Sequence, residues 1–213
     1  VAPENILGLT FTRNAAQQMR EKLKPVLNTT ASKVNLSTIH SFCHRMLKDQ
    51  DRVFEMIYGK RQIMLIHRVM KKQRLNDVLP AVALREISLA KHKLICCEEF
   101  SRLHEDNQTM LSVAEIYQGY EQEKNKRLLL DFDDLIIEVH KLLKAYDEIR
   151  YKYQQAFPHI LVDEYQDTNP AQVQTLNLLL NGADQYGSFW ICGDDWQSIY
   201  GFTGATIDNI LNF

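Results

Sequence analysis

The sequence lacks the long apolar runs and the cysteine patterns that mark membrane, secreted and zinc-binding proteins. No apolar stretch approaches the roughly 18 residues that a membrane-spanning helix needs. The N-terminal residues VAPENILGL have neither the basic region nor the cleavage site of a signal peptide. The four cysteines form no CxxC pair and have no histidine at zinc-ligand spacing. We therefore expect a cytoplasmic protein with reduced cysteines and no contact with a membrane.

Acidic and basic side chains nearly balance in number, yet they are unevenly distributed along the chain. Residues 1–44 carry five basic and two acidic side chains, residues 45–127 carry sixteen and twelve, and residues 128–213 carry four and thirteen. The first two thirds could face a polyanion, whereas the last third gathers acid where a cation would bind. A solvated surface would explain the same imbalance, so charge alone does not decide the function.

The order of the expected elements favours an α/β fold with a parallel sheet. Short apolar runs predict buried strands in the segments ILGL, VNLS, HILVDE and SFWICGDD. Segments with helical periodicity follow these strands, and this alternation is typical of parallel sheets. Residues 45–127 show no strand alternation and contain one proline, so we expect them to form a mainly helical insertion.

Polar side chains follow three of the expected strands. These side chains are Thr10 and Thr12, Asp163 and Glu164, and Asp194 and Asp195 with Gln197. Ligands of open α/β sheets bind beyond the carboxyl ends of the strands, so Asp163 would hold Mg²⁺ there. Glu164 would orient or deprotonate an attacking water, and Gln197 would sense a γ-phosphate. Solvated loop acids give the same short pattern, so these residues alone do not establish the site.

Five segments, taken in order, resemble the motifs of the UvrD/Rep group of superfamily-one DNA helicases. They are LTFTRNAAQQM, STIHSFCHRML, LLLDFDDLI, DEYQDTNPAQ and CGDDWQSIYGFTGA. The tryptophan in the last segment resembles the helicase IV branch more than UvrD or Rep themselves. The resemblance implies a partial RecA-like sheet of the P-loop NTPase class. Its core would comprise residues 1–44 and 128–213, with a mainly α-helical inserted subdomain at 45–127.

The resemblance also implies an activity. It indicates an ATP-dependent 3′-to-5′ helicase or translocase that acts on single-stranded DNA and on junctions between single and double strands, in repair or recombination. The implied cofactors are ATP and Mg²⁺, and repair proteins are possible partners. Such a protein would work in the bacterial cytosol or nucleoid. The six basic residues between positions 60 and 74 are candidates for contact with duplex DNA, although a solvated helix face is the simpler interpretation.

The motifs carry individual roles over to this chain. Asp163 matches the magnesium carboxylate, Glu164 the catalytic base and Gln197 the γ-phosphate contact. Gln166, Asp167 and Asp194 would belong to the network between these groups. The motifs that line the single-stranded DNA path contain Thr10, Phe11, Thr12, Asn14, His40, Ser41, Tyr200 and Phe202. Independently of the family, an exposed aromatic ring can stack on any base, with about 1–3 kcal/mol per stack.

The chain departs from the family pattern in what it omits. None of its eight glycines fits a GxxxxGK[ST] loop, whose amides and lysine cradle the phosphates. The second RecA-like domain, which supplies an arginine finger, is also absent, and losing that finger can lower the rate by roughly 10³–10⁵. Thr203 stands where many relatives carry arginine. We therefore expect this chain by itself neither to bind ATP well nor to hydrolyse it.

Three alternatives remain open from the sequence. The chain could belong to the helicase half of a RecB/AddA-type helicase–nuclease, which a nuclease domain elsewhere in the protein would decide. It could be a non-catalytic DNA-binding module, for which DNA affinity would fall steeply with salt and ignore nucleotide. It could also be a P-loop ATPase that never touches nucleic acid, which the aromatic segment SIYGF argues against.

Overall fold

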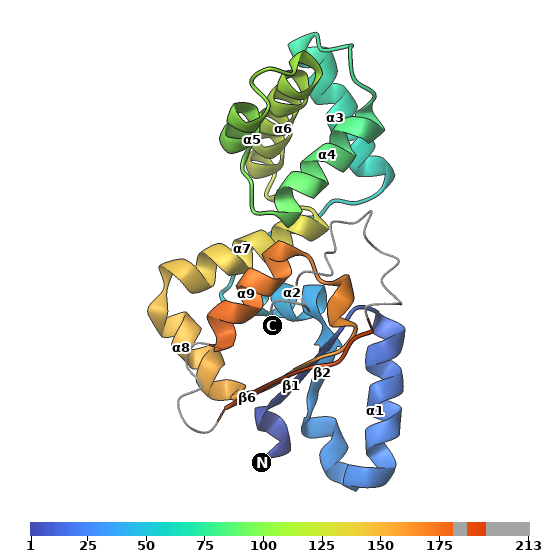
Figure 1. The fold of residues 1–213 in the computed structure, drawn as a ribbon, viewed down its shortest axis with the longest axis vertical. Helices are drawn as coiled ribbons and strands as arrows, with labels where there is room; N and C mark the ends of the chain where they lie inside the picture. The colour runs from blue at the N-terminus through green and yellow to red at the C-terminus, as the bar shows by residue number, and fades with distance from the viewer. Residues whose placement is uncertain (181–186, 195–213) are drawn as a thin grey trace. The chain divides into compact units, whose positions relative to one another are not determined.

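The computed structural model describes residues 1–180 and 187–194, and the chain divides into two compact units. The sheet unit comprises Val1–Leu47 and the chain from Glu138 onward, and the helical unit comprises Lys48–Ile137 (Figure 1). The expected α/β fold, with a parallel sheet and a mainly helical inserted unit, is confirmed. The helical unit continues to Ile137, beyond the limit of 127 that the sequence suggested.

The described part of the sheet unit contains four parallel strands in the order β2-β1-β5-β6. Their bounds are β1 Ile6–Thr10, β2 Asn35–Thr38, β5 His159–Val162 and β6 Ser188–Ile191. Leu9 pairs with Val162, and Val162 pairs with Ile191. This register places the carboxyl ends of β1, β5 and β6 side by side at one edge of the sheet.

Helices cover both faces of this sheet (Figure 1). α1 is Arg13–Leu27, α2 is Ile39–Asp49, α8 is Asp147–Ala156 and α9 is Pro170–Leu180, with short 3-10 helices at Pro3–Asn5, Asn28–Lys33 and Tyr165–Asp167. The ring of Phe42 on α2 packs edge-on against Tyr153 on α8. Residues of β1 and β5 such as Leu7 and Ile160 are therefore buried between helical layers.

The expectation that β6 is a buried strand is wrong. Trp190 on β6 is 64% exposed, and Leu161 on the neighbouring β5 is 42% exposed. α1 packs against β1 and β2 and leaves an apolar cavity of about 540 Å³ beside these two side chains. β6 is the last strand of the described sheet, so it has a neighbour on one side within that sheet.

The helical unit is built around its own apolar core. Its helices are α3 Lys60–Gln73, α4 Pro80–His92, α5 Cys97–Leu103, α6 Gln108–Lys126 and the first turns of α7 Phe132–Ala145. Ile66 of α3, Ile87 of α4 and Ile116 of α6 meet in this core and are essentially buried. Pro80 begins α4, where its missing N–H costs nothing. Among the described residues, no helix combines the length and apolar character that crossing a membrane requires.

A short strand pair in the helical unit was not expected from the sequence. β3 Glu55–Met56 runs parallel to β4 Leu129–Leu130. Each strand has two residues, which is too short for an alternating pattern to be visible. The pair joins the start of the unit to the segment that leads into α7.

Candidate functional site

The carboxyl ends of three neighbouring strands continue beyond the sheet in register. The N–H of Asp163 donates to the carbonyl of Leu9 at 2.8 Å, and the N–H of Cys192 donates to the carbonyl of Val162 at 2.8 Å. The N–H of Tyr165 then donates to the carbonyl of Cys192 at 3.0 Å. These bonds fix the segments after β1, β5 and β6 beside one another, which is the arrangement expected of a ligand site in an open α/β sheet.

Asp163 and Glu164 leave this edge as a pair of partly buried carboxylates. Neither forms an ion pair with any residue that the structure describes. Glu164 adopts a left-handed backbone conformation, with φ 54° and ψ 42°. A residue other than glycine is uncommon in this region, and such strain concentrates at functional sites. The conformation turns the chain sharply between the strand and the 3-10 helix that follows.

Gln166 connects the two strand ends. Its side chain is 1% exposed. Its Nε2 donates to Oε2 of Glu164 at 2.6 Å, and its Oε1 accepts from the N–H of Asp194 at 3.2 Å. One buried amide therefore holds the carboxylate of Glu164 and the backbone after β6 at the same time. The structure thus brings together three of the residues that the sequence placed in one network.

Two buried oxygens near this edge have no hydrogen-bond partner among the described residues: Oγ1 of Thr10 and Oδ1 of Asp167. Buried polar atoms are normally paired, so each is available to a water or a ligand. Burial raises the pKa of Asp167, and the charge of Glu164 raises it further. The donors at this edge are carboxylate and hydroxyl oxygens, which are the ligands that Mg²⁺ prefers. The residues present therefore fit a magnesium ion.

The residues expected along the DNA path begin the two helices that follow β1 and β2. Oγ1 of Thr12 accepts from the N–H of Ala15 at 3.1 Å, so Thr12 caps the N-terminus of α1. Oγ1 of Thr38 accepts from the N–H of Ser41 at 3.1 Å and donates to its Oγ at 2.8 Å. Phe11 and His40 are partly buried, and Asn14 is exposed. All of them follow strand ends at the same edge as Asp163.

Several of the expected site residues lie outside the described residues. They are Gln197, Tyr200 and Phe202, together with Thr203. Their expected contacts with the γ-phosphate and with bases therefore stay predictions.

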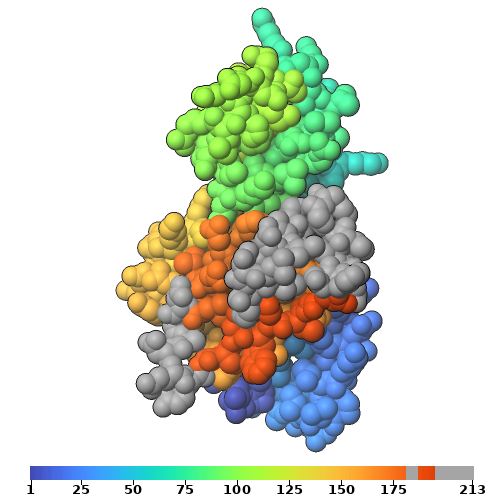
Figure 2. All heavy atoms as spheres, in the orientation of Figure 1, coloured from blue at the N-terminus to red at the C-terminus, as the bar shows by residue number. Residues whose placement is uncertain are grey.

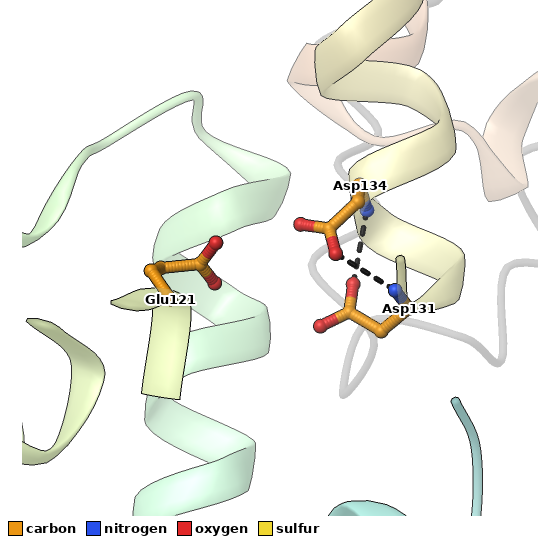
Figure 3. Close-up of side chains that lie close together, drawn as sticks. All are labelled: Glu121, Asp131 and Asp134. Atoms are coloured by element: carbon orange, nitrogen blue, oxygen red, sulfur yellow. Dashed lines mark hydrogen bonds between the residues drawn. The ribbon is translucent and has the colours of Figure 1, made fainter. Parts of the chain in front are cut away.

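A second group of carboxylates lies in the helical unit. Asp131 directly precedes α7 and Asp134 lies in its first turn. The two cap the start of this helix, because the N–H of Asp134 donates to Oδ1 of Asp131 at 3.0 Å and the N–H of Asp131 donates to Oδ2 of Asp134 at 2.7 Å. Figure 3 shows these reciprocal bonds, with Glu121 of α6 nearby. The three carboxylates lie within 4.8 Å of one another.

Two buried lysines, each 1% exposed, form ion pairs with these three carboxylates. Nζ of Lys91 lies 2.8 Å from Asp131, 2.6 Å from Asp134 and 2.8 Å from Glu121. Nζ of Lys124 contacts the same three groups, at 2.9 Å from Asp131 and from Glu121. The ammonium groups stand where a metal ion would, so the group is an ion network. Sequence reasoning missed it because Lys91 lies forty residues from Asp131.

The ion network changes the pKa values of its own lysine and carboxylate groups. Burial alone would lower the pKa of Lys91, but the three carboxylates raise it well above its ordinary value. Burial alone would raise the pKa of Asp131, but Lys91 and Lys124 lower it below its usual range. Burial raises the pKa of Asp134 from 3.8 to about 6, with the charge of Asp131 adding to the effect. Three carboxylates share two lysines, so one of them takes up a proton first.

Comparison with known proteins gives one consistent result. The family described as "UvrD/REP helicase N-terminal domain" matches residues 1–213. The chain is 38% identical over its whole length to the ATP-dependent DNA helicase PcrA of Bacillus subtilis, of which it covers 29%. It is 36% identical to the ATP-dependent DNA helicases PcrA of Staphylococcus aureus and Staphylococcus epidermidis, of which it covers 30%. The chain thus spans about three tenths of the length of these relatives.

Proposed function

The chain belongs to the UvrD/REP helicase N-terminal domain family, and we propose that it forms part of the motor of an ATP-dependent DNA helicase. The observation that carries this proposal is the strand edge. There, Asp163 and Glu164 have no ion pair among the described residues, and Gln166 holds Glu164 against the segment after β6. The similarity to PcrA proteins supports ATP as the nucleotide and DNA as the partner.

The strand edge suggests a division of labour in hydrolysis. Asp163 would hold Mg²⁺, which neutralises charge on the transferring phosphate. Glu164 would accept a proton from the attacking water, and its left-handed backbone fixes where the carboxylate lies. Gln166 would keep that carboxylate oriented toward the water, because its buried amide donates a hydrogen bond to Glu164. Gln197 would contact the γ-phosphate, and Asp167 and Asp194 would complete the network.

Single-stranded DNA would pass along the same edge. Phe11, Tyr200 and Phe202 would stack on bases, which requires no particular sequence. Thr10, Thr12, Asn14, His40 and Ser41 would lie beside the backbone. We propose 3′-to-5′ movement and action at junctions during repair or recombination, on the basis of the family resemblance. Repair proteins would be the partners.

The 213-residue chain alone would hydrolyse little ATP. Its sequence contains no GxxxxGK[ST] loop, and a site without that phosphate cradle binds nucleotide weakly. Robust magnesium-dependent ATPase activity of the isolated chain would contradict this expectation.

The proposed function is tested by the ATPase rate of the full-length protein, with and without single-stranded DNA. We expect strong stimulation by DNA and a loss of roughly 10²–10⁴ in rate for Glu164→Gln. Glu148→Gln removes an exposed carboxylate of α8 and should leave the rate unchanged. Hydrolysis that ignores DNA would overturn the DNA role. DNA binding with no nucleotide effect would favour a non-catalytic binding module instead.

A further inference from the structure

Two of the four cysteines are adjacent to each other in the helical unit. Cys96 directly precedes α5, and Cys97 is the first residue of that helix. Both carry free thiols, Cys96 exposed and Cys97 partly buried. The segment 97–103, green in Figure 2, lies at the surface of the unit. A ligand can therefore reach both sulfurs from solvent.

One carboxylate holds both thiols. Sγ of Cys97 donates to Oε2 of Glu98 at 3.3 Å, and the thiol of Cys96 donates to the same carboxylate group. The backbone N–H of Glu98 and these two thiols lower the pKa of the carboxylate, so it is ionised at neutral pH. Two sulfurs and a negatively charged oxygen group are thus gathered at one point of the surface.

The same residues line a cavity beside α6. α5 packs against α6, and a cavity of about 380 Å³ has Cys97, Glu98 and Arg102 of α5 and Glu115 of α6 in its lining. Arg102 and Glu115 contribute one charge of each sign. The carboxylate of Glu98 therefore leaves the charged groups of this lining with a net negative charge, which favours a cation over an anion.

The types of donor decide which cation would fit. Thiolate sulfur is a ligand for Zn²⁺ and softer ions, whereas Mg²⁺ and Ca²⁺ prefer oxygen ligands. Two cysteine sulfurs and one carboxylate oxygen make three protein ligands, and a water can complete the tetrahedron that Zn²⁺ prefers. The group of Glu121, Asp131 and Asp134 differs in both respects, since its donors are all oxygens and two lysines already occupy it.

A disulfide between the two cysteines is a poorer use of this pair. The peptide that joins them is trans, which sets their Cα atoms about 3.8 Å apart, whereas disulfides usually span about 4.4–6.8 Å. Burial and the Glu98 carboxylate raise the pKa of Cys97 to about 11, so this thiol is protonated at neutral pH and reacts slowly with oxidants. A metal ion, unlike an oxidant, displaces the proton directly.

We propose that Cys96, Cys97 and Glu98 bind a thiophilic divalent cation of the Zn²⁺ type. On binding, two metal–sulfur bonds and one metal–oxygen bond form, and the two thiol protons leave to solvent. The exposed side chain of Cys96 is free to rotate about its Cα–Cβ bond, which allows its sulfur to approach that of Cys97. The site uses no residue of the strand edge, so it does not depend on the proposed function.

The test uses the full-length protein, reduced and freed of metal by a chelator that is then removed. Cd²⁺ is the first probe, because cadmium–thiolate bonds absorb in the ultraviolet. Excess Mg²⁺ is present to occupy sites made of oxygen ligands alone. We expect an absorption band that is absent when Cys96→Ser and Cys97→Ser are combined. The difference between the two proteins isolates this pair from every other cysteine of the full-length protein.

Single variants then test the ligands one at a time, with Zn²⁺ affinity measured by competition with a chromophoric chelator. Cys96→Ser and Cys97→Ser should each weaken the cadmium band and raise Kd for Zn²⁺ at least about tenfold. Glu98→Gln keeps both sulfurs and should raise Kd by a similar factor. The matched control Glu99→Gln removes the next exposed carboxylate and should leave Kd unchanged.

The melting temperature gives an independent readout. Without metal it should be the same for all the variants, which shows that they fold. Zn²⁺ should raise it for the unsubstituted protein more than for the double serine variant, because a bound ion stabilises the state that binds it.

Three results would count against the site. An unchanged cadmium band in the double serine variant would overturn it outright. A band that is lost in Cys96→Ser but intact in Cys97→Ser would show adventitious binding to one exposed thiol. An unchanged Kd for Zn²⁺ in Glu98→Gln would overturn the carboxylate as a ligand. None of these measurements involves ATP or DNA, so their failure would leave the proposed function standing.

Discussion

Two groups of carboxylates in this chain differ in where their counter-charges come from. In the helical unit, Glu121, Asp131 and Asp134 surround the ammonium groups of Lys91 and Lys124, which the same unit supplies. At the strand edge, Asp163 and Glu164 form no ion pair with any described residue. Glu164 instead accepts a hydrogen bond from a neutral amide.

The difference shows how acidic residues acquire structural or functional roles. A buried carboxylate with a built-in lysine holds helices together and leaves no room for a metal ion. A carboxylate at a strand end, held in place by neutral groups, keeps its charge available for a ligand. Both groups begin as acids after an apolar run, DFDD after LLL and DE after HILV, so the local sequence does not separate them.

We call Glu121, Asp131 and Asp134 with their two lysines the closed group, and Asp163 with Glu164 the open group. The largest effect on stability is expected at Lys91 of the closed group. Lys91→Met leaves three carboxylates, of which Asp131 and Asp134 are buried, with one lysine. Breaking a buried ion network typically costs about 3–5 kcal/mol. Lys93→Met, two residues away and exposed, should change stability by less than about 0.5 kcal/mol. Urea unfolding of the two variants and of the unsubstituted protein measures both changes in stability.

The same experiment tests the open group. Glu164→Gln removes a carboxylate that has no ion pair among the described residues, and its amide can still accept from Gln166. We expect the free energy of unfolding to stay within about 0.5 kcal/mol of that of the unsubstituted protein. The same substitution in the full-length protein should abolish ATPase activity. A large loss of stability in Glu164→Gln, or a small one in Lys91→Met, would break the distinction between the two groups.

The next effect concerns how the open group is held. Gln166→Leu keeps the volume of the side chain but removes both hydrogen bonds, to Glu164 and to Asp194. We expect the rate of ATP hydrolysis by the full-length protein to fall by roughly 10–100-fold. Losses of this size are typical when a residue that orients a metal ligand is removed. Because Gln166 positions Glu164, kcat should fall more than KM rises. Gln166→Glu places a second carboxylate beside Glu164 and should raise the pH needed for activity.

A third variant would convert the closed group into an open one. Lys124→Met removes one built-in cation from carboxylates that lie within 4.8 Å of one another. We expect Mg²⁺ to raise the melting temperature of this variant and to leave that of the parent unchanged, since ligands stabilise the state that binds them. The melting temperature with and without a chelator measures the effect. No response to Mg²⁺ would show that carboxylate spacing alone does not make a cation site.

The sequence predicted the strand edge because its cause is local. A short apolar run followed by carboxylates gives a strand and its end, and parallel order brings the ends of β1 and β5 to one edge. The family motifs then supplied the roles. The fold class and the cap at Thr12 could be predicted for the same reason, since each depends on neighbouring residues.

The features that escaped prediction depend on distant residues. Lys91 and Asp131 meet only after α4 packs beside α7, and nothing near either residue indicates the other. The pairing of Glu55 with Leu129 is equally distant, and its strands are too short to show a pattern. The exposure of Trp190 depends on which elements pack against that face of the sheet. An apolar run in the sequence predicts a strand but does not indicate which elements cover it.

The smallest effect is a pH dependence of the closed group. The pKa of Asp134 is raised from 3.8 to about 6 in the folded protein by burial and by Asp131. A raised pKa means that the folded state holds the proton more tightly, so its contribution to stability is complete below about pH 4 and is lost as pH rises through about 6. Asp131 has a lowered pKa, so its contribution is already complete above about pH 4.

The two residues can therefore be separated by their pH ranges. Between about pH 4.5 and 6, the free energy of unfolding of the parent should fall by on the order of 1–2 kcal/mol relative to Asp134→Asn, which cannot titrate there. Urea unfolding at several pH values measures the difference. A flat difference would mean that the two lysines fully compensate the third carboxylate. The third carboxylate of the closed group would then remain ionised across this pH range. Its excess negative charge would therefore have no measurable effect on stability.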